Sequence, residues 1–355
     1  MANEYCRHLS NGFRFLHKNL VYQPCCWVPE SPPVQNIEQL NRYRNDITAK
    51  VLANKEKYCQ DCIKRETSGS NKSLRQKSFW QIPESSNDGD VVDLSIQIDT
   101  TCNAACSICG PHFSSLWQKE LNPIAKLENT INKYIELAKI LDLSKLQTIR
   151  FYGGEPLVNN NHLILLKAIP NSENVSIMYS TNGSIVPDKE TLEIWSKFKK
   201  VHISFSIDDI GERFHYIRWP LSWNKVKNNI EQFATFQEVT LINFNCTVNP
   251  MNILYFDQLE SWNEKLQTRF AKVSTINISA CYGIWGTDAI PEKLRSRVIE
   301  KYGNGHKIVK LLTSFEFNPK KWDLLVQEMK RADTRRNLSW TKTFPEVAAI
   351  CQSVD

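Results

Sequence analysis

Six short segments with the alternation of β-strands constrain the fold of this 355-residue chain more than any other feature. In one of them Val92, Leu94, Ile96 and Ile98 alternate with polar residues, a period of two that is typical of a strand. Helical patterns, such as the one that begins at Ile131, fall between most of these segments. Strands that alternate with helices favour βαβ units and an α/β fold with a parallel sheet. The predicted strands are 91–98, 148–152, 175–181, 201–207, 240–248 and 276–280.

The sequence changes character on both sides of this region. Six parallel strands would form a partial (βα)6 barrel or an open curved sheet, with chemistry expected at the carboxyl ends of the strands. Before them, a helix is expected over 37–52 and a hairpin turn at Asn11-Gly12. We predict a small cysteine-rich N-terminal module at 1–65, a polar linker at 66–90, the parallel core at 91–285 and a helical C-terminal extension at 286–355.

The composition excludes few kinds of protein. Hydrophobic residues make up 41% of the chain, which is ordinary for a globular protein. The 44 basic and 38 acidic residues give a net charge of +6, and this mild excess is only a weak hint of an anionic partner. No apolar run approaches the roughly 18 residues of a membrane span, and the N-terminus does not read as a secretory signal. We expect a cytoplasmic protein with neither membrane nor nucleic acid as a partner.

Three of the eleven cysteines follow the first predicted strand closely. Cys102, Cys106 and Cys109 have three and then two residues between them. A structural zinc site usually takes four ligands in two pairs, so a compact triple suits zinc poorly. Three thiolates on a cubane iron–sulfur cluster leave one iron open to bind a substrate or cofactor. The spacing therefore favours a [4Fe–4S] cluster with one open position, and fortuitous or zinc-binding cysteines are the alternative.

Further motifs follow the later predicted strands in chain order. Gly153-Gly154-Glu155-Pro156 follows the second strand, Thr181-Asn182-Gly183 ends the third, and Ser206-Ile207-Asp208-Asp209 ends the fourth, with Arg218 after it. Each motif alone would be read as a turn. Together with the cysteine spacing, they resemble the motifs of the radical SAM enzymes, and the resemblance covers residues 91–285.

The resemblance implies what each motif does. In that family the open iron holds the amino and carboxylate groups of S-adenosylmethionine, and an electron from the cluster cleaves the cofactor to methionine and a 5′-deoxyadenosyl radical. Asp209 departs from the family, which usually has glycine there, and Cys246 is expected to be a core thiol. The implied cluster ligands are Cys102, Cys106 and Cys109. The implied cofactor contacts are Gly153, Gly154 and Glu155 at the ammonium, Thr181 and Asn182 beside the adenosine, and Ser206 and Arg218 at the carboxylate.

Five other cysteines precede the predicted core. By spacing they suit zinc or an iron–sulfur cluster equally well. Their order resembles the auxiliary-cluster module called SPASM, or its shorter twitch form, although that module usually follows the barrel. The resemblance implies one auxiliary [4Fe–4S] cluster, and zinc is the alternative. The expected ligands are Cys6, Cys25, Cys59 and Cys62, with Cys26 as the substitute for Cys25, because neighbours on an extended strand face opposite sides.

The sequence thus predicts an enzyme that abstracts a hydrogen atom from its substrate. By analogy with relatives that carry such a module, the substrate is expected to be a peptide or protein side chain. A small metabolite, sugar or nucleotide remains open. The resemblance also implies an electron donor such as a flavodoxin, a ferredoxin or a reductase. The rival from another class is a non-catalytic iron–sulfur or zinc protein.

Overall fold

The computed structural model describes residues 6–16, 20–68, 73–84, 86–126 and 129–352. The chain divides into two compact units, and each unit is built from segments that are not consecutive in the sequence. The first unit takes residues 1–102, 121–180 and 187–202, and the second takes 103–120, 181–186 and 203–355. Among the described residues, no helix has both the length and the apolar character that a membrane span requires.

The first unit contains a mainly parallel sheet with the strand order β2-β1-β3-β4-β5. Leu94, Ile96, Ile149 and Ile177 are fully buried, so the alternation seen in the sequence does mark the core face of these strands. β1 pairs with β2 in the antiparallel sense and with β3 in the parallel sense, and β3-β4-β5 are parallel. The strands are β1 (Gly12–Leu16), β2 (Val21–Tyr22), β3 (Asp93–Gln97), β4 (Thr148–Phe151) and β5 (Ser176–Thr181).

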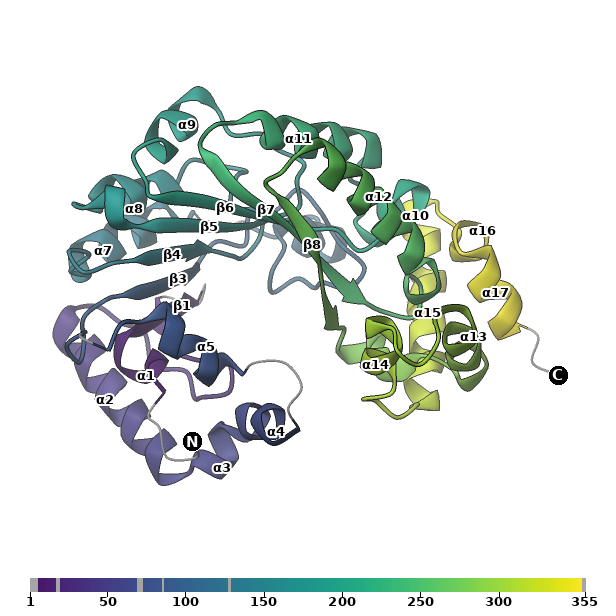
Figure 1. Ribbon diagram of the computed structural model, residues 1–355, viewed down its shortest axis with the longest axis horizontal. Helices are drawn as coiled ribbons and strands as arrows, with labels where there is room; N and C mark the ends of the chain where they lie inside the picture. The colour runs from purple at the N-terminus through teal and green to yellow at the C-terminus, as the bar shows by residue number, and fades with distance from the viewer. Residues whose placement is uncertain (1–5, 17–19, 69–72, 85, 127–128, 353–355) are drawn as a thin grey trace. The chain divides into compact units, whose positions relative to one another are not determined.

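Helices of the first unit connect these strands. Figure 1 shows α7 (Ile131–Ile140), α8 (His162–Ala168) and α9 (Lys189–Trp195) one after another beside the strands, and neighbours in this series pack together. A short 3₁₀ helix, η1 (Ser172–Asn174), precedes β5. These helices are the crossovers that parallel strands require.

The N-terminal segment adds helices and one strand to the first unit. The expected helix is confirmed as α2 (Ile37–Ala53), which Asn36 caps. Asn11-Gly12 is the junction between α1 and β1, so placing the hairpin turn there was wrong; the antiparallel pair is formed by β1 and β2. Part of the expected linker is helical, with a capping box at Ser73. The helices are α1 (His8–Asn11), α2, α3 (Lys55–Tyr58), α4 (Gln60–Ser68) and α5 (Leu74–Gln81).

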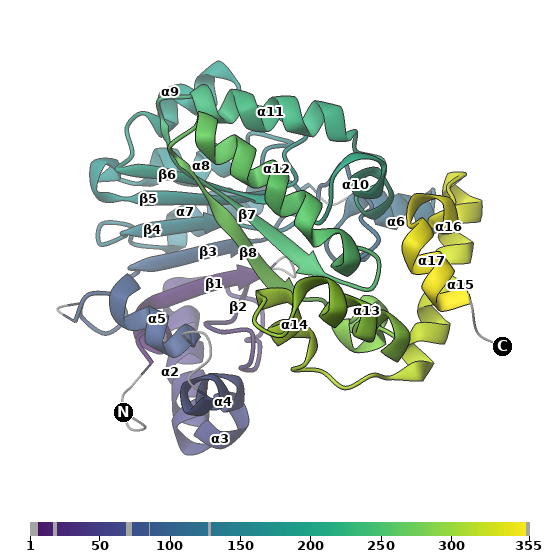
Figure 2. The ribbon, with the colours of Figure 1, turned by 45° about the vertical axis from the view of Figure 1, so that its right-hand side comes forward.

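The second unit contains the strand order β6-β7-β8, formed by most of β6 (Lys200–Ser206), by β7 (Val239–Val248) and by β8 (Val273–Ala280). β7 and β8 are parallel. α11 (Trp223–Thr235) packs on β7 and α12 (Phe256–Arg269) packs on β8, as Figure 2 shows. The other helices are α6 (Ser115–Leu121), α10 (Gly211–Ile217), α13 (Glu292–Tyr302), α14 (Lys307–Leu312), α15 (Pro319–Arg336), α16 (Trp340–Thr343) and α17 (Pro345–Gln352), with 3₁₀ helices η2 (Ile253–Tyr255), η3 (Gly283–Trp285) and η4 (Thr287–Ala289).

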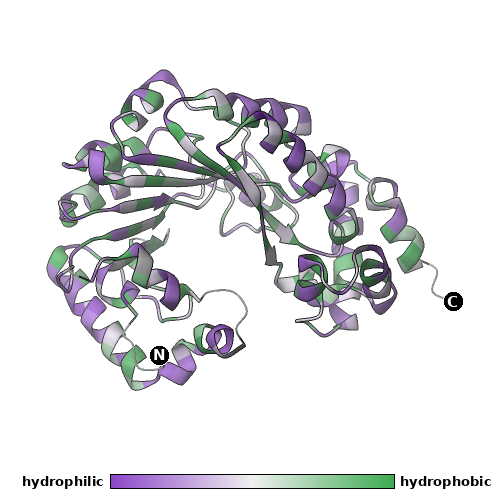
Figure 3. Cartoon of the chain, in the orientation of Figure 1, coloured by the Kyte–Doolittle hydropathy of each residue, from purple (hydrophilic) through white to green (hydrophobic). Residues whose placement is uncertain are grey.

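The α/β class and the parallel pairing are therefore confirmed. All six predicted strands are present, each within a few residues of its expected ends. Figure 3 shows apolar and polar residues alternating along the strands, as expected where one side chain in two enters a core. The sequence predicted a hairpin about Asn11-Gly12 but not the parallel pairing of β1 with β3, which extends the parallel strands with a segment from the cysteine-rich region.

Candidate functional site

The loop that follows β3 carries Cys102, Cys106 and Cys109, and we call it the cysteine loop. It begins with a buried carboxylate, Asp99. This carboxylate accepts hydrogen bonds from the main-chain N–H of Thr101 (2.8 Å), the hydroxyl of Thr130 (2.7 Å) and the amide of Asn159 (3.2 Å). Burial raises the pKa of Asp99, but these hydrogen bonds outweigh it and bring the pKa below its usual value. Sequence reasoning did not single out this residue; its position at the start of the loop was the available signal. Asp99 anchors the loop to α7 and to the chain after β4.

The two glycines after β4 lie against the main chain of the same loop. Gly154 N–H donates to the carbonyl of Asp99 (2.9 Å) and Glu155 N–H donates to the carbonyl of Thr101 (2.7 Å). A Cβ at Gly154 would overlap the Thr101 carbonyl, and Gly153 has a φ of +112°, which favours glycine. Glu155 is buried. The glycines are therefore required by contact between two loops of the protein itself.

Cys102 ends the first unit, and the other two cysteines of the motif belong to the second unit. Cys106 is 8% exposed and Cys109 is exposed. The N–H of Cys109 donates to the carbonyl of Cys106 (3.0 Å), and the indole of Trp117 donates to the same carbonyl (2.8 Å). Burial raises the pKa of the Cys106 thiol to about 11, against the opposing effect of Arg218. A bound metal would have to overcome this cost of forming the thiolate.

Arg218 is a charged residue that contacts one of these cysteines directly. One of its Nη atoms lies 2.7 Å from the carboxylate of Asp208, and the other donates to the sulfur of Cys106 (3.8 Å). Its Nε is buried and has no hydrogen-bond partner within the described chain. Asp208 also accepts from the N–H of Thr247 (2.8 Å), as expected of a residue that orders the turn after β6. The unsatisfied Nε leaves one buried donor for a ligand oxygen.

The motif after β5 also reaches the cysteine loop. Asn182 donates through its side-chain amide to Asn103 (2.9 Å), and Asn103 donates to the hydroxyl of Ser184 (2.8 Å). Thr181 accepts from the N–H of Gly183 (3.1 Å). The side chains of the expected adenosine motif therefore take part in ordering the turn and the loop. Ser206, the last residue of β6, is half-buried.

The five N-terminal cysteines interact with one another although they come from distant parts of the sequence. Burial raises the pKa of the Cys6 thiol to about 11, and the neighbouring thiols of Cys62 and Cys59 also act to raise it. Cys25 and Cys26 share a hydrogen bond that raises the pKa of Cys25 and lowers that of Cys26 to about 6. They lie in a bend and a turn, so the expectation that an extended strand separates their side chains was wrong. The two thiols therefore lie close to one another.

The remaining cysteines either pack in the core, as expected, or lie away from the N-terminal cysteines and the cysteine loop. Cys246 on β7 is fully buried, and its thiol donates to the carbonyl of Asp208 (3.6 Å). Within the described residues, no three His, Cys, Asp or Glu side chains are arranged to hold a single metal ion. A cubane cluster is larger than one ion. Three thiols in one short loop have the donor chemistry for such a cluster, and the unsatisfied N–H of Arg218 has the donor chemistry for a carboxylate.

Comparison with known proteins identifies the core. Residues 96–254 match the model of the Radical SAM superfamily. The chain contains a radical SAM domain. This domain implies S-adenosylmethionine and a [4Fe–4S] cluster as cofactors. The matched residues run from β3 to η2, so they include the cysteine loop and the motifs after β4, β5 and β6.

The relatives are distant, and each is matched over only a part of its own length. The chain is 28% identical over 218 residues to a GTP 3′,8-cyclase of Moorella thermoacetica, which covers 59% of this chain and 63% of that protein. It is 29% identical over 178 residues to the radical SAM cyclopropyl synthase TigE of Paramaledivibacter caminithermalis, covering 46% of this chain and 37% of that protein. The chain thus spans less than two thirds of the length of these relatives.

The solved structures that the comparison found share little sequence with this chain. Streptococcus suis SuiB bound to S-adenosylmethionine is 13% identical, with a TM-score of 0.40 over 78% of this chain and 62% of that one. The protein anSMEcpe with bound AdoMet is 16% identical, with a TM-score of 0.42 over 59% of this chain and 58% of that one.

Proposed function

We propose that the protein is a radical SAM enzyme that reductively cleaves S-adenosylmethionine and abstracts a hydrogen atom from its substrate. The proposal is carried by one observation: the match to the superfamily spans the strands whose ends bear the cysteine loop and the cofactor motifs. Cys102, Cys106 and Cys109 would hold the cluster. When bound, the cluster supplies the electron that breaks the carbon–sulfur bond of the cofactor.

The protein's own residues would position the cofactor. Gly153, Gly154 and Glu155 would lie at the methionine ammonium, and the buried Glu155 would supply negative charge there. Thr181 and Asn182 would lie beside the adenosine. Ser206 and Arg218 would hold the carboxylate, and the unsatisfied Nε of Arg218 supports this role because a buried N–H gains most from a charged acceptor.

The N-terminal cysteines would form a second centre. We assign one auxiliary [4Fe–4S] cluster to Cys6, Cys59, Cys62 and either Cys25 or Cys26, in a twitch-like module at residues 1–65. The influence of these thiols on one another supports a shared ligand set. Zinc is the alternative occupant, and it is disfavoured because no three side chains of the described residues are arranged to hold a single metal ion. Residues 66–90 would link the module to a partial (βα)6 barrel at 91–285, and residues 286–355 would be a helical extension.

A peptide or protein side chain is the proposed substrate, on the resemblance of the N-terminal cysteines to an auxiliary-cluster module. A nucleotide is the second candidate, because several relatives are GTP 3′,8-cyclases. Electrons would come from a flavodoxin, a ferredoxin or a reductase in the cytoplasm. Incubation of the reduced enzyme with GTP or with candidate peptides, followed by mass analysis of the products, separates the two substrate classes.

The cleavage step itself is tested on anaerobically reconstituted protein with dithionite and S-adenosylmethionine. We expect release of 5′-deoxyadenosine, and we expect Cys106→Ala to reduce it to background because the cluster loses a ligand. Cys351→Ala, which alters a cysteine on α17 outside both groups, is the matched control and should retain cleavage. Iron-loaded wild-type protein that releases no 5′-deoxyadenosine, with or without candidate substrates, would favour the non-catalytic iron–sulfur protein instead.

A further inference from the structure

The guanidinium of Arg218 contacts a cluster-ligand residue as well as the proposed carboxylate site. Arg218 is 7% exposed, and the Cys106 sulfur that it approaches at 3.8 Å is also buried. In buried surroundings a charged N–H donor interacts strongly with a thiolate, because little water screens the charges. Cys109 feels the charge of the same guanidinium.

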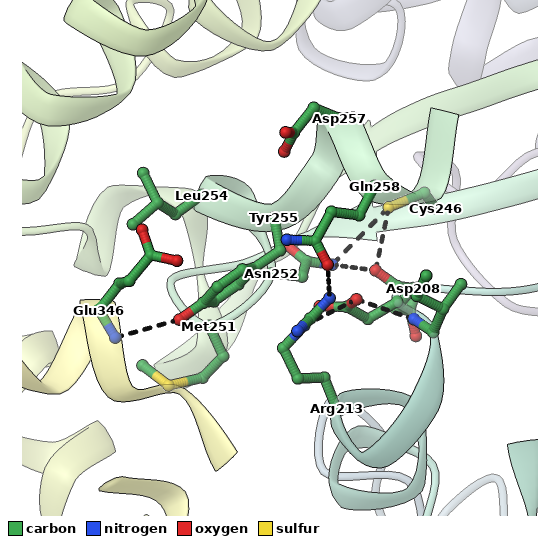
Figure 4. A network of polar contacts seen from close by, with 12 residues as sticks. Asp208, Arg213, Cys246, Met251, Asn252, Leu254, Tyr255, Asp257, Gln258 and Glu346 are labelled. Carbon is green, nitrogen blue, oxygen red and sulfur yellow. Dashed lines mark hydrogen bonds and ion pairs between the residues drawn. The ribbon is translucent and has the colours of Figure 1, made fainter. Parts of the chain in front are cut away.

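Asp208 holds this guanidinium in place and partly cancels its charge. The carboxylate of Asp208 lies 2.7 Å from Nη2 of Arg218, and Asp208 is only 1% exposed. Its own position is fixed by the N–H of Thr247 and, at its main-chain carbonyl, by the side-chain amide of Asn252 (2.9 Å); Figure 4 shows Asn252 and Cys246 directed at Asp208. The pair is therefore a rigid dipole with its positive end toward Cys106.

We propose that Arg218 is a positioning residue whose hydrogen bond to Cys106, balanced by Asp208, sets the reduction potential of the [4Fe–4S] cluster. Reduction adds one negative charge to a centre whose ligands are already anionic, so a fixed N–H donor and cation at a ligand sulfur favour the reduced state. Asp208 acts in the opposite direction. This inference rests on the proposed function, because it requires the cluster to be present.

The test is a redox titration of the reconstituted protein, followed by the electron paramagnetic resonance signal of the reduced cluster. Cys59→Ala/Cys62→Ala serves as the background, so that the N-terminal cysteines contribute no second signal. We expect Arg218→Met to make the reduced state about tenfold less favourable, which is about 59 mV lower for a one-electron couple. Asp208→Asn should shift the potential upward, and Arg218→Lys should lie between Arg218→Met and the unchanged protein.

Arg213→Met is the matched control. Arg213 also pairs with a buried aspartate, Asp209 (2.9 Å), but its other partners are Gln258 and the ring of Tyr255, as in Figure 4, and none of its contacts is a cysteine. Its removal should leave the potential unchanged.

The outcomes separate the two proposals. A protein that forms no reducible cluster overturns the proposed function. A protein that forms the cluster and cleaves S-adenosylmethionine, but whose potential is the same in Arg218→Met and Asp208→Asn, overturns only the role of Arg218. Opposite shifts in these two variants, with Arg213→Met unchanged, support it. If Arg218→Met does not load iron, the upward shift in Asp208→Asn still decides.

Discussion

The two groups of cysteines differ in how the chain brings them together. Cys102, Cys106 and Cys109 occupy one short loop, whose first residues are held by hydrogen bonds of Asp99 and of the main chain after β4. The N-terminal thiols come from three segments and interact with one another, near the ion pair of the buried Arg75 with the half-buried Glu66. A ligand set within one segment is defined by spacing, whereas a set from several segments depends on the fold of the whole N-terminal region.

The largest expected effect tests whether the two groups are independent. Cys59→Ala/Cys62→Ala should lower the iron content from about eight to about four atoms per chain, because only the second cluster loses ligands. Release of 5′-deoxyadenosine should persist, because the cysteine loop keeps its three thiols. Iron analysis and product analysis measure both. If zinc replaces part of the iron in unaltered protein and disappears in the variant, the zinc alternative is correct; loss of both iron groups would contradict independence.

A second effect concerns the pH dependence of stability and a buried histidine that contacts a residue holding Asp99. The ring of His162 is buried against Phe151 and Tyr179, and its Nδ1 lies 3.1 Å from the carbonyl of Asn159, whose side chain holds Asp99. Burial lowers the pKa of His162 from 6.5 to about 4.

The sign of the resulting pH dependence follows from linkage. Between pH 6.5 and 4 the unfolded chain binds the proton more readily than the folded one, so stability is full above pH 6.5 and falls by about 3 kcal/mol toward pH 4. Denaturant unfolding of the metal-free protein across this range measures it. His162→Gln cannot titrate there and should lose less stability on acidification; equal losses in both proteins would exclude His162 as the cause.

The smallest effect separates two glycines near the cysteines. Gly154→Ala should reduce the free energy of unfolding by about 2 kcal/mol, because the added Cβ would overlap the carbonyl of Thr101. Gly110→Ala has open space around the new methyl group and should change stability by less than about 0.5 kcal/mol. Unfolding curves of the two metal-free variants compare them directly. Equal destabilisation would mean that the contact between the two loops does not limit residue size at Gly154.

Much of the core was predictable because its signals are local. The period-two alternation in segments such as 201–207 depends only on neighbouring residues, and it located all six strands. The turn at Asn11-Gly12 was misplaced because Asn-Gly suits several turns, and the helix α1 that precedes β1 is too short to give a periodic signal. The parallel pairing of β1 was missed because its partner, β3, lies far along the sequence.

The sequence alone determined the α/β class, the positions of the strands and the radical SAM motifs, since each is written in residues that are close along the chain. Only the tertiary structure decided that Asp99 anchors the cysteine loop, that Arg218 contacts both Asp208 and Cys106, and that Cys25 and Cys26 face one neighbourhood. These are contacts between distant segments or depend on the local turn. Their energies come from burial and hydrogen-bond geometry, which residue spacing does not specify.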